Sequence, residues 1–331
     1  MDWYLYALYA LLIAVLAFAL DFVFGDPPNR VHPVAWMGRF IGFIDKHLKR
    51  TSQRADRLRG IFLALAPILF FTIVFTFLLA LLREFVNAFV WALACAVLLK
   101  LVFTVRTMER HTRPIIAAIE RDDLEAARAA SAMIVGRDVT QLDREHIISC
   151  AAESTAESTA DGAFSPLFFL AFFGIPGAIF YRVCNTLDSM VGYKKPKWID
   201  VGRFSAKLDD AVNWIPARLS LPFVLAGLAV TGNDWREGWR MSKKYRHSAA
   251  SPNKGWTMAA YAGGLGIRYE KVGYYQMGDG PLPTDPKVIK RTADVLLAST
   301  LIFFLVFVLP LFMFIGIQVQ LILENVLTGW F

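Results

Sequence analysis

Charged residues and cysteines are scarce in this sequence. Lys, Arg, Asp and Glu make up 19% of the 331 residues and hydrophobic residues 56%, whereas globular domains are about 25% charged and about 45–50% apolar. This balance excludes a disordered, collagen-like or purely cytosolic protein. The three cysteines (Cys95, Cys150 and Cys184) form no CxxC pair, so neither a disulfide framework nor a zinc or iron–sulfur site is implied.

The common nucleotide-binding and nucleophile motifs are also missing. No GxxxxGK[ST] phosphate loop occurs, and the glycines of residues 263–266 lack the spacing and the preceding strand of a dinucleotide-binding loop. G-x-S-x-G and H-E-x-x-H are absent as well. A nucleotide would therefore have to be held by scattered Lys and Arg side chains together with carboxylates that bind a metal ion.

Long apolar runs predict membrane helices. Four of them have the roughly 20 residues that a helix needs to cross a bilayer, and they cover residues 3–24, 61–82, 85–105 and 293–323. Two shorter runs, 164–181 and 215–231, contain prolines that predict broken, tilted or re-entrant helices. No segment shows the pattern of a strand. We expect a mainly α-helical, polytopic protein with four to six membrane helices and large cytoplasmic helical loops, all within one integral membrane domain over residues 1–331.

The distribution of basic residues predicts the topology. Loop 25–60 has eight Lys and Arg and loop 106–163 has seven, so the positive-inside rule places both in the cytoplasm. We expect a multi-pass plasma-membrane protein in which region 106–292 presents most of the polar motifs to the cytoplasm. The net charge of +7 is spread over several loops and does not indicate a nucleic-acid partner. Asp21 and Lys100 lie in apolar runs near helix ends, where we expect snorkelling to the interface.

One helix face is predicted to present three carboxylates. Glu153, Glu157 and Asp161 recur every four residues, and residues 145–163 contain no Lys or Arg. Like charges at this spacing repel unless a cation lies between them. We therefore favour a bound magnesium ion or ammonium group over the alternative, an exposed acidic face.

Polar residues also follow the first broken run. Arg182, Asn185 and Asp188 share a helix face, and Tyr193 and Lys194 come soon after. The mixture of donors, acceptors and cations suits an anionic ligand with a metal ion. The alternative is a set of anchors at the membrane interface.

A third group of polar residues precedes the second broken run. Lys207 is followed by Asp209 and Asp210, which point to different faces of a helix, so we expect one to bind metal and the other to cap or pair. Arg218 lies in the apolar run directly after this pair, and for it we favour function over snorkelling.

Two turns complete the set of candidate residues. His32 lies in a proline-rich turn, where it is either a ligand contact or, as is more usual for a lone histidine, structural. Asn253 and Lys254 lie where a turn leads into a helix.

Taken together, these motifs resemble the adenosylcobinamide-phosphate synthase family (CbiB/CobD type) of cobalamin biosynthesis. The similar segments, in order, are GDPPNRVHPVAWMGR, GRDVTQLD, AESTADGAFSPLFF, GIPGAIFYRVCNTLDSMVGYK, GRFSAKLDDAVNWIPARLS and SPNKGWTMAAYAGGLGIRYE. The resemblance runs from about Asp21 to Asp294, which is nearly the whole chain.

The resemblance implies an ATP- and Mg²⁺-dependent amide ligation at the lipid bilayer. Adenosylcobyric acid would be joined to an amino-alcohol phosphate of the aminopropanol phosphate type, through an acyl phosphate, to give adenosylcobinamide phosphate. Other late membrane enzymes of the pathway are expected partners. The alternatives are a corrinoid-related membrane transporter and a non-catalytic signalling relative, which would be expected to lose the acidic and NTLDSMVGYK motifs.

The residues can be assigned to this chemistry by role. The metal ligands expected are Glu153, Glu157, Asp161, Asp209 and Asp210. The catalytic residues expected are Glu153, Glu157, Asp161, Asn185, Asp188, Lys207 and Asp209. The substrate- and phosphate-binding residues expected are His32, Arg137, Arg182, Tyr193, Lys194, Arg218, Asn253 and Lys254. One of the acids or His32 would deprotonate the amine, and the aromatic candidates for the corrin rim are Trp36, Tyr193, Trp256, Tyr274 and Tyr275.

Overall fold

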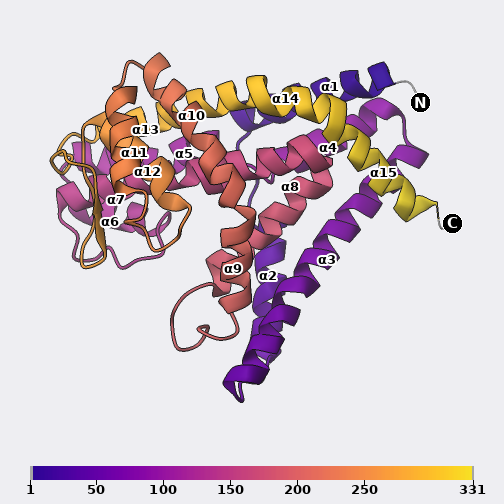
Figure 1. The fold of residues 1–331 in the computed structure, drawn as a ribbon, viewed down its shortest axis with the longest axis horizontal. Helices are drawn as coiled ribbons and strands as arrows, with labels where there is room; N and C mark the ends of the chain where they lie inside the picture. Colours follow the sequence, from indigo (N-terminus) through magenta and orange to yellow (C-terminus); the bar gives the residue numbers. More distant parts are fainter. Residues whose placement is uncertain (1–2, 330–331) are drawn as a thin grey trace. The chain divides into compact units, whose positions relative to one another are not determined.

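A computed structural model describes residues 3–329, and helices dominate its secondary structure (Figure 1). The α-helices are α1 (Trp3–Val23), α2 (Pro33–His47), α3 (Gln53–Phe85), α4 (Ala88–Lys100), α5 (Arg106–Glu120), α6 (Leu124–Ala132), α7 (Arg144–Ser158), α8 (Ser165–Val191), α9 (Arg203–Val212), α10 (Trp214–Val230), α11 (Trp235–Tyr245), α12 (Lys254–Leu265), α13 (Lys287–Phe303), α14 (Leu309–Leu311) and α15 (Ile317–Thr328). The π-helical segments are η1 (Thr159–Phe164), η2 (Phe304–Val308) and η3 (Phe312–Gly316). The prediction of a mainly α-helical, polytopic protein is confirmed.

Side-chain caps explain where several helices begin. Asn87 accepts a hydrogen bond from the Val90 amide at 3.0 Å at the start of α4, and Asp143 accepts one from the His146 amide at 2.9 Å at the start of α7. Each cap satisfies an amide that has no partner within its own helix. The polar residues between the apolar runs thus fix the helix boundaries.

The chain packs as two compact units that alternate along the sequence. Unit 1 comprises Met1–Phe103, Ser165–Val212 and Val306–Phe331, and unit 2 comprises Thr104–Phe164 and Asn213–Leu305. In unit 1, α3 packs against α8 and α15, and α1 packs against α4. In unit 2, α12 packs against α10, α11 and α7. The motifs of region 182–212 belong to unit 1.

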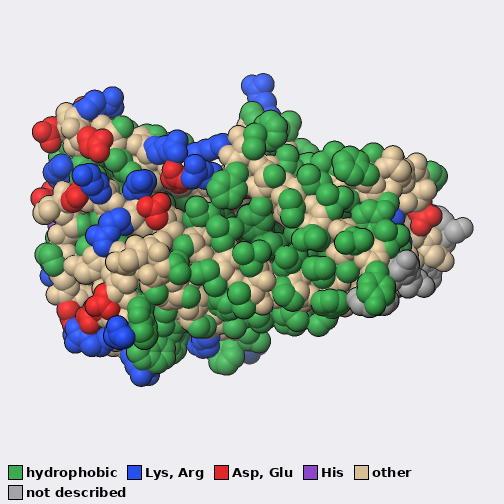
Figure 2. All heavy atoms as spheres, turned by 90° about the horizontal axis from the view of Figure 1, so that it is seen from above, with side chains coloured by type: hydrophobic (Ala, Val, Ile, Leu, Met, Phe, Trp, Pro, Cys, Tyr) green, Lys and Arg blue, Asp and Glu red, His purple; other side chains and the backbone are tan. Residues whose placement is uncertain are grey.

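Four helical stretches among residues 3–329 are long and apolar enough to cross a membrane. They are Tyr4–Val23, Gln53–Phe85, Arg144–Val191 and Lys287–Thr328, and the pair α9 and α10, bent by 44°, makes a fifth if it counts as one broken span. Large hydrophobic side chains are exposed on these helices, among them Tyr4, Leu8 and Val306. Figure 2 shows such side chains forming an almost continuous hydrophobic surface over α1 and α14, as expected for helices that face lipid.

The expected crossing over residues 85–105 was wrong in its length. The chain breaks at Val86 and Asn87, and α4 then has only 13 residues, or about 20 Å of helix against a hydrocarbon core of about 30 Å. The helix begins after its cap Asn87 and ends at the charged residue Lys100. The apolar run in the sequence includes the turn before α4 and residues 101–105 after it, so the predicted span was longer than the helix.

The prolines and glycines of the first short run do break its helix. Gly174 inside α8 has φ 65° and ψ −156°, which are not helical. The break leaves the Ile175 amide without a partner in its own helix, and this amide donates to Gln320 Oε1 of α15 at 3.0 Å. A broken helix is tolerated at membrane depth where other protein covers the freed backbone groups. Here α15 provides that cover.

Replacing Gly174 with alanine is expected to lower the thermal unfolding midpoint strongly. A Cβ there would lie 2.6 Å from Gln320 Cβ and 2.9 Å from the Gly316 carbonyl oxygen, which gives a steric cost of about 1–3 kcal/mol. The backbone conformation of Gly174, which residues other than glycine rarely adopt, adds about 1–3 kcal/mol. Gly232→Ala is the matched control, because Gly232 has φ +73° but nothing within 4 Å of its Cβ position. Equal shifts for the two variants in detergent would contradict the close packing at Gly174.

A short hairpin corrects the expectation that no strand would form. Strands β1 (Tyr269–Lys271) and β2 (Tyr275–Met277) pair antiparallel, with Tyr269 opposite Met277. Three residues per strand are too few for an alternating pattern to be visible in sequence. The Glu270 amide donates to Ser149 Oγ of α7 at 3.1 Å, which fixes the hairpin against the helix with the carboxylates.

Candidate functional site

The acidic helix face of unit 2 is built on α7 and η1. Glu153 and Glu157 lie on α7, and Asp161 lies on the π-helical continuation. The small residues between them, such as Ala152 and Ala156, are fully buried, so the helix packs closely against its neighbours. Single π-helical turns within α-helices are frequent at functional sites.

Glu153 is a buried carboxylate with two partners. It is 5% exposed, Arg137 Nη2 lies 3.0 Å from its Oε2, and the Tyr275 hydroxyl donates to its Oε1. Burial, the largest single effect, opposes the charge on Arg137, but Glu153, Cys150 and Tyr275 together outweigh it and raise the pKa of the guanidinium. Burial, reinforced by the charge of Glu153, raises the pKa of Tyr275, so its hydroxyl keeps its proton. Glu153 is thus fixed by donors from a loop and from β2.

Glu157 and Asp161 share one ammonium group. Lys254 Nζ at the start of α12 contacts Glu157 Oε1 and lies 3.6 Å from Asp161 Oδ2. The Lys254 side chain is 27% exposed and that of Glu157 35%, so both are accessible to a ligand. The acidic face therefore has protein cations beside it, Arg137 at one end and Lys254 at the other.

The position of Lys254 depends on the turn before it. Its neighbour Asn253 is 3% exposed and accepts a hydrogen bond from Arg218 Nη1 at 3.1 Å. Arg218 also donates to the Trp214 carbonyl oxygen at 2.7 Å and lies 4.3 Å from the centre of the Trp214 ring. Three residues predicted separately, Arg218, Asn253 and Lys254, are brought together in unit 2.

The residues after the broken helix form a second group, in unit 1. Arg182 Nε donates to the Val102 carbonyl oxygen at 2.6 Å, and its Nη1 lies 3.4 Å from Asn185 Oδ1. Asp188 lies one turn further, close to Gly192, where a Cβ would be 2.0 Å from its Oδ1. Tyr193 and Lys194 follow the end of α8. The predicted shared face of Arg182 and Asn185 is present as a direct contact.

The adjacent aspartates of α9 have different surroundings, as expected from helix geometry. Asp209 is 5% exposed, Asp210 is half-buried and Lys207 is exposed. All three belong to unit 1. The five predicted metal ligands are therefore divided between the units, with Glu153, Glu157 and Asp161 in unit 2.

His32 has a structural role at the start of α2. Its Nδ1 accepts a hydrogen bond from the Val34 amide at 3.2 Å, and its Nε2 lies 3.9 Å from Asp26 Oδ1. A ring nitrogen that accepts from an amide is unprotonated, so the neutral ring has its proton on Nε2. This capping bond agrees with the structural alternative for His32 and leaves Nε2 for other partners.

The expectation of snorkelling at Asp21 and Lys100 was wrong. Lys100 is 4% exposed and Asp21 is fully buried. The Lys100 ammonium contacts Asp26 and lies 3.9 Å from Asp21 Oδ1. Because α4 ends at Lys100 rather than continuing to residue 105, the Lys100 side chain meets Asp21 in the last turn of α1 and Asp26 just after that helix, instead of reaching for water.

The carboxylates of residues 3–329 do not assemble into a preformed metal cage. No group of three or more His, Cys, Asp or Glu side chains in this part of the chain is placed to hold a metal ion. Mg²⁺, however, is usually bound by one or two carboxylates with phosphate oxygens and water as its other ligands. Glu157 and Asp161, which converge on one cation, fit this pattern.

Two contacts of the site had no clear signal in the sequence. Tyr275 is predicted from the sequence as an aromatic for the corrin rim, yet its hydroxyl donates to Glu153. Asp45 is not among the predicted residues, although it is 9% exposed and contacts Arg50, Lys197 and Trp198. The bond from Tyr275 to Glu153 and the contacts of Asp45 with Lys197 and Trp198 join segments far apart in the chain, where spacing along one helix gives no information.

Comparison with known proteins identifies similar sequences but no similar solved structure. The sequence model of the family described as CobD/Cbib protein matches residues 14–302. A cobalamin biosynthesis protein CobD from Dehalococcoides mccartyi is 39% identical over 283 residues, which cover 84% of this chain and 90% of the relative. A probable cobalamin biosynthesis protein CobD from Thermococcus kodakarensis is 38% identical over 281 residues, 85% of this chain and 90% of the relative. No solved structure matches.

Proposed function

The chain belongs to the CobD/CbiB family of cobalamin biosynthesis, and from this premise we propose that it is an ATP- and Mg²⁺-dependent ligase. It joins the free propionate of adenosylcobyric acid to the amine of an amino-alcohol phosphate of the aminopropanol phosphate type. The product is adenosylcobinamide phosphate. The reaction takes place at the plasma membrane, with the site on the cytoplasmic side.

The observation that supports this proposal most is the pairing of Lys254 with Glu157 and Asp161. A ligase that uses ATP must neutralise the phosphates while their charge is redistributed. Lys254 supplies a partly exposed ammonium for this purpose, and the two carboxylates would hold Mg²⁺, which when bound neutralises phosphate charge. Arg218, in contact with Asn253, fixes the turn from which Lys254 projects.

The reaction would proceed in two displacements. The corrinoid carboxylate oxygen attacks the γ-phosphorus of ATP, and ADP leaves, which gives an acyl phosphate. The amine nitrogen then attacks the acyl carbon, phosphate leaves, and a base takes the proton lost by the amine. In unit 2, the fixed pair Arg137 and Glu153 keeps the acidic face in place during these steps.

Residues of unit 1 would take part in binding the anionic substrates. Arg182 and Asn185 are in contact on α8, and Asp188 follows one turn later. Lys194 and Tyr193 come after the helix end, and Lys207, Asp209 and Asp210 lie on α9. We assign these groups to orientation of the substrates, because proximity and alignment provide much of the rate of such ligations. Association with other late membrane enzymes of the pathway would explain the location at the bilayer.

The release of ADP by the detergent-purified protein tests this function. We expect ADP only when adenosylcobyric acid, aminopropanol phosphate, ATP and Mg²⁺ are all present, with adenosylcobinamide phosphate formed in equal amount. Omitting either organic substrate is the control and should reduce ADP release to background. Corrinoid movement across vesicles without ATP consumption would contradict the ligase and support a transporter.

A further inference from the structure

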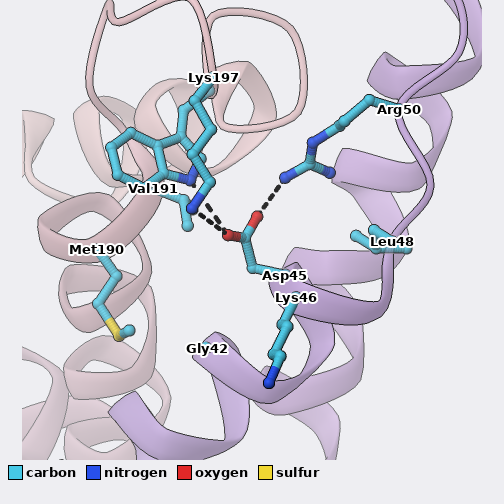
Figure 3. Close-up of a pocket in the computed structure, with 9 residues that line it drawn as sticks. Gly42, Asp45, Lys46, Leu48, Arg50, Met190, Val191 and Lys197 are labelled. Carbon is cyan, nitrogen blue, oxygen red and sulfur yellow. Dashed lines mark hydrogen bonds and ion pairs between the residues drawn. The ribbon is translucent and has the colours of Figure 1, made fainter.

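Unit 1 contains a pocket that none of the carboxylates of unit 2 lines. It has a volume of about 610 Å³ and is formed by the end of α2 and the segment that joins α8 to α9 (Figure 3). The residues around it are Gly42, Asp45, Lys46, Leu48, Arg50, Met190, Val191, Lys197 and Trp198. Pockets of about 300–1,000 Å³ are typical of small-molecule sites.

A buried carboxylate organises the wall of this pocket. The Asp45 side chain is 8% exposed, contacts Arg50, and has Lys197 Nζ at 3.3 Å from its Oδ2. The Trp198 indole N–H donates to the same Oδ2 at 3.3 Å. Asp45 is also close to the C-terminal end of α2, where the helix dipole disfavours a negative charge. Its position is therefore maintained by these donors, and it in turn holds two cations and an indole at the pocket.

The pocket retains an excess of positive charge after this pairing. Three cationic side chains, Lys46, Arg50 and Lys197, surround one carboxylate. Figure 3 shows Arg50 and Lys197 approaching Asp45 from different elements, whereas the Lys46 side chain points away from the carboxylate. Within the described part of the chain, Lys46 has no ion pair. Membrane topology requires only that Lys and Arg be present in such a loop, and it gives no reason for a buried carboxylate that holds Arg50 and Lys197 beside a cavity.

We propose that this pocket binds a phosphate group. Arg and Lys side chains held at fixed positions are the usual ligands of phosphate oxygens, because charge-assisted hydrogen bonds to them are strong. The group would come either from the headgroup of an anionic phospholipid or from a free phosphate compound. Asp45 acts as a positioning residue, and Lys46, Arg50 and Lys197 contact the anion. Binding at this pocket is independent of the proposed ligase activity and can be measured without turnover.

Hydrogen–deuterium exchange of the full chain gives a local measure of binding. Inorganic phosphate is added to the detergent-purified protein, with chloride at equal ionic strength as the blank, and exchange is followed in peptides covering 43–50 and 190–200. In the second arm, the protein is placed in phosphatidylcholine nanodiscs with or without phosphatidylglycerol. Protection by phosphate identifies a free phosphate compound as the source, and protection by phosphatidylglycerol alone identifies a lipid headgroup.

Matched lysine variants separate a specific site from general positive charge. Lys46→Gln should require about tenfold more phosphate or phosphatidylglycerol for half-protection, which corresponds to about 1.4 kcal/mol. Lys49→Gln, which removes the same charge from a residue that does not line the pocket, should behave as the unchanged protein. Lys197→Gln and its neighbour Lys195→Gln form a second pair, with the loss expected only for Lys197.

Two results would overturn the proposal. One is the absence of protection in both arms. The other is equal behaviour of Lys46→Gln and Lys49→Gln, since the anion would then respond to the overall charge of the loop. Neither result depends on ADP release, so failure here and failure of the ligase assay are distinguishable.

Discussion

Replacing Glu157 with glutamine is expected to lower the rate of ADP release by about 100-fold or more. Losses of this size are typical when an enzyme loses one fixed polar or charged group that stabilises the charge formed in the transition state. The change keeps the size of the side chain but removes its charge beside Lys254. It also replaces one of the two carboxylates that we assign to Mg²⁺ with a neutral amide, whose oxygen is a weaker ligand. We therefore expect the remaining activity to need more Mg²⁺ for half-saturation.

Glu145→Gln provides the matched control for this variant. Glu145 lies in the first turn of α7, and Glu157 is near the end of the same helix, so both variants lose one charge from α7. We expect Glu145→Gln to keep the unchanged Mg²⁺ dependence and ADP rate. If Glu157→Gln had the same rate and Mg²⁺ dependence as the unchanged protein, the assignment of the acidic face would be wrong, even if ADP release still required both substrates.

Replacing Gln320 with leucine is expected to destabilise the protein strongly. Gln320 is fully buried, its Oε1 accepts from the Ile175 amide, and its Nε2 donates to Glu324 Oε1 at 2.8 Å. Leucine fills a similar volume but leaves a buried amide and a buried carboxylate oxygen without these bonds. Each such loss costs about 1–3 kcal/mol, and more for charged groups, so we expect a total of about 3 kcal/mol or more.

The thermal unfolding midpoint in detergent measures this effect, and Gln318→Leu is the control. Gln318 is half-buried and two residues from Gln320 on α15, so it points about 200° away around the helix. We expect a drop of several degrees for Gln320→Leu and little change for Gln318→Leu. Faster hydrogen exchange at the Ile175 amide in the first variant would link the loss to the helix break. Similar midpoints for both variants would refute the role of Gln320.

Properties that depend on local sequence were predictable. The apolar runs predicted α1, α3 and the C-terminal helices, and the four-residue spacing predicted that Glu157 and Asp161 lie close enough to share a cation, as both do with Lys254. The break near Gly174 followed from its glycines and prolines. These features depend on helix periodicity and on backbone conformations that neighbouring residues determine.

The partners of these residues were not predictable, because they come from distant segments. The cation between Glu157 and Asp161 is Lys254, 97 residues after Glu157, and no spacing rule connects them. The same holds for the hydrogen bond from Tyr275 to Glu153. Tyr275 belongs to a hairpin that is too short to be recognised in the sequence. Lys100 was misjudged because the interpretation depended on a helix end that hydropathy placed five residues too late.

The bond between Ile175 and Gln320 also has a consequence for biosynthesis. The two residues are separated by 145 positions, and a ribosome that adds about 5–20 residues per second needs about 7–30 s to reach the acceptor. During that time, the freed amide of α8 must be satisfied by water or by the membrane-insertion machinery. Unit 2 is fully translated by Leu305, whereas unit 1 still awaits Val306 onward. The residues of the carboxylate cluster are therefore all translated before Gln320, the partner of the broken helix α8, is added to the chain.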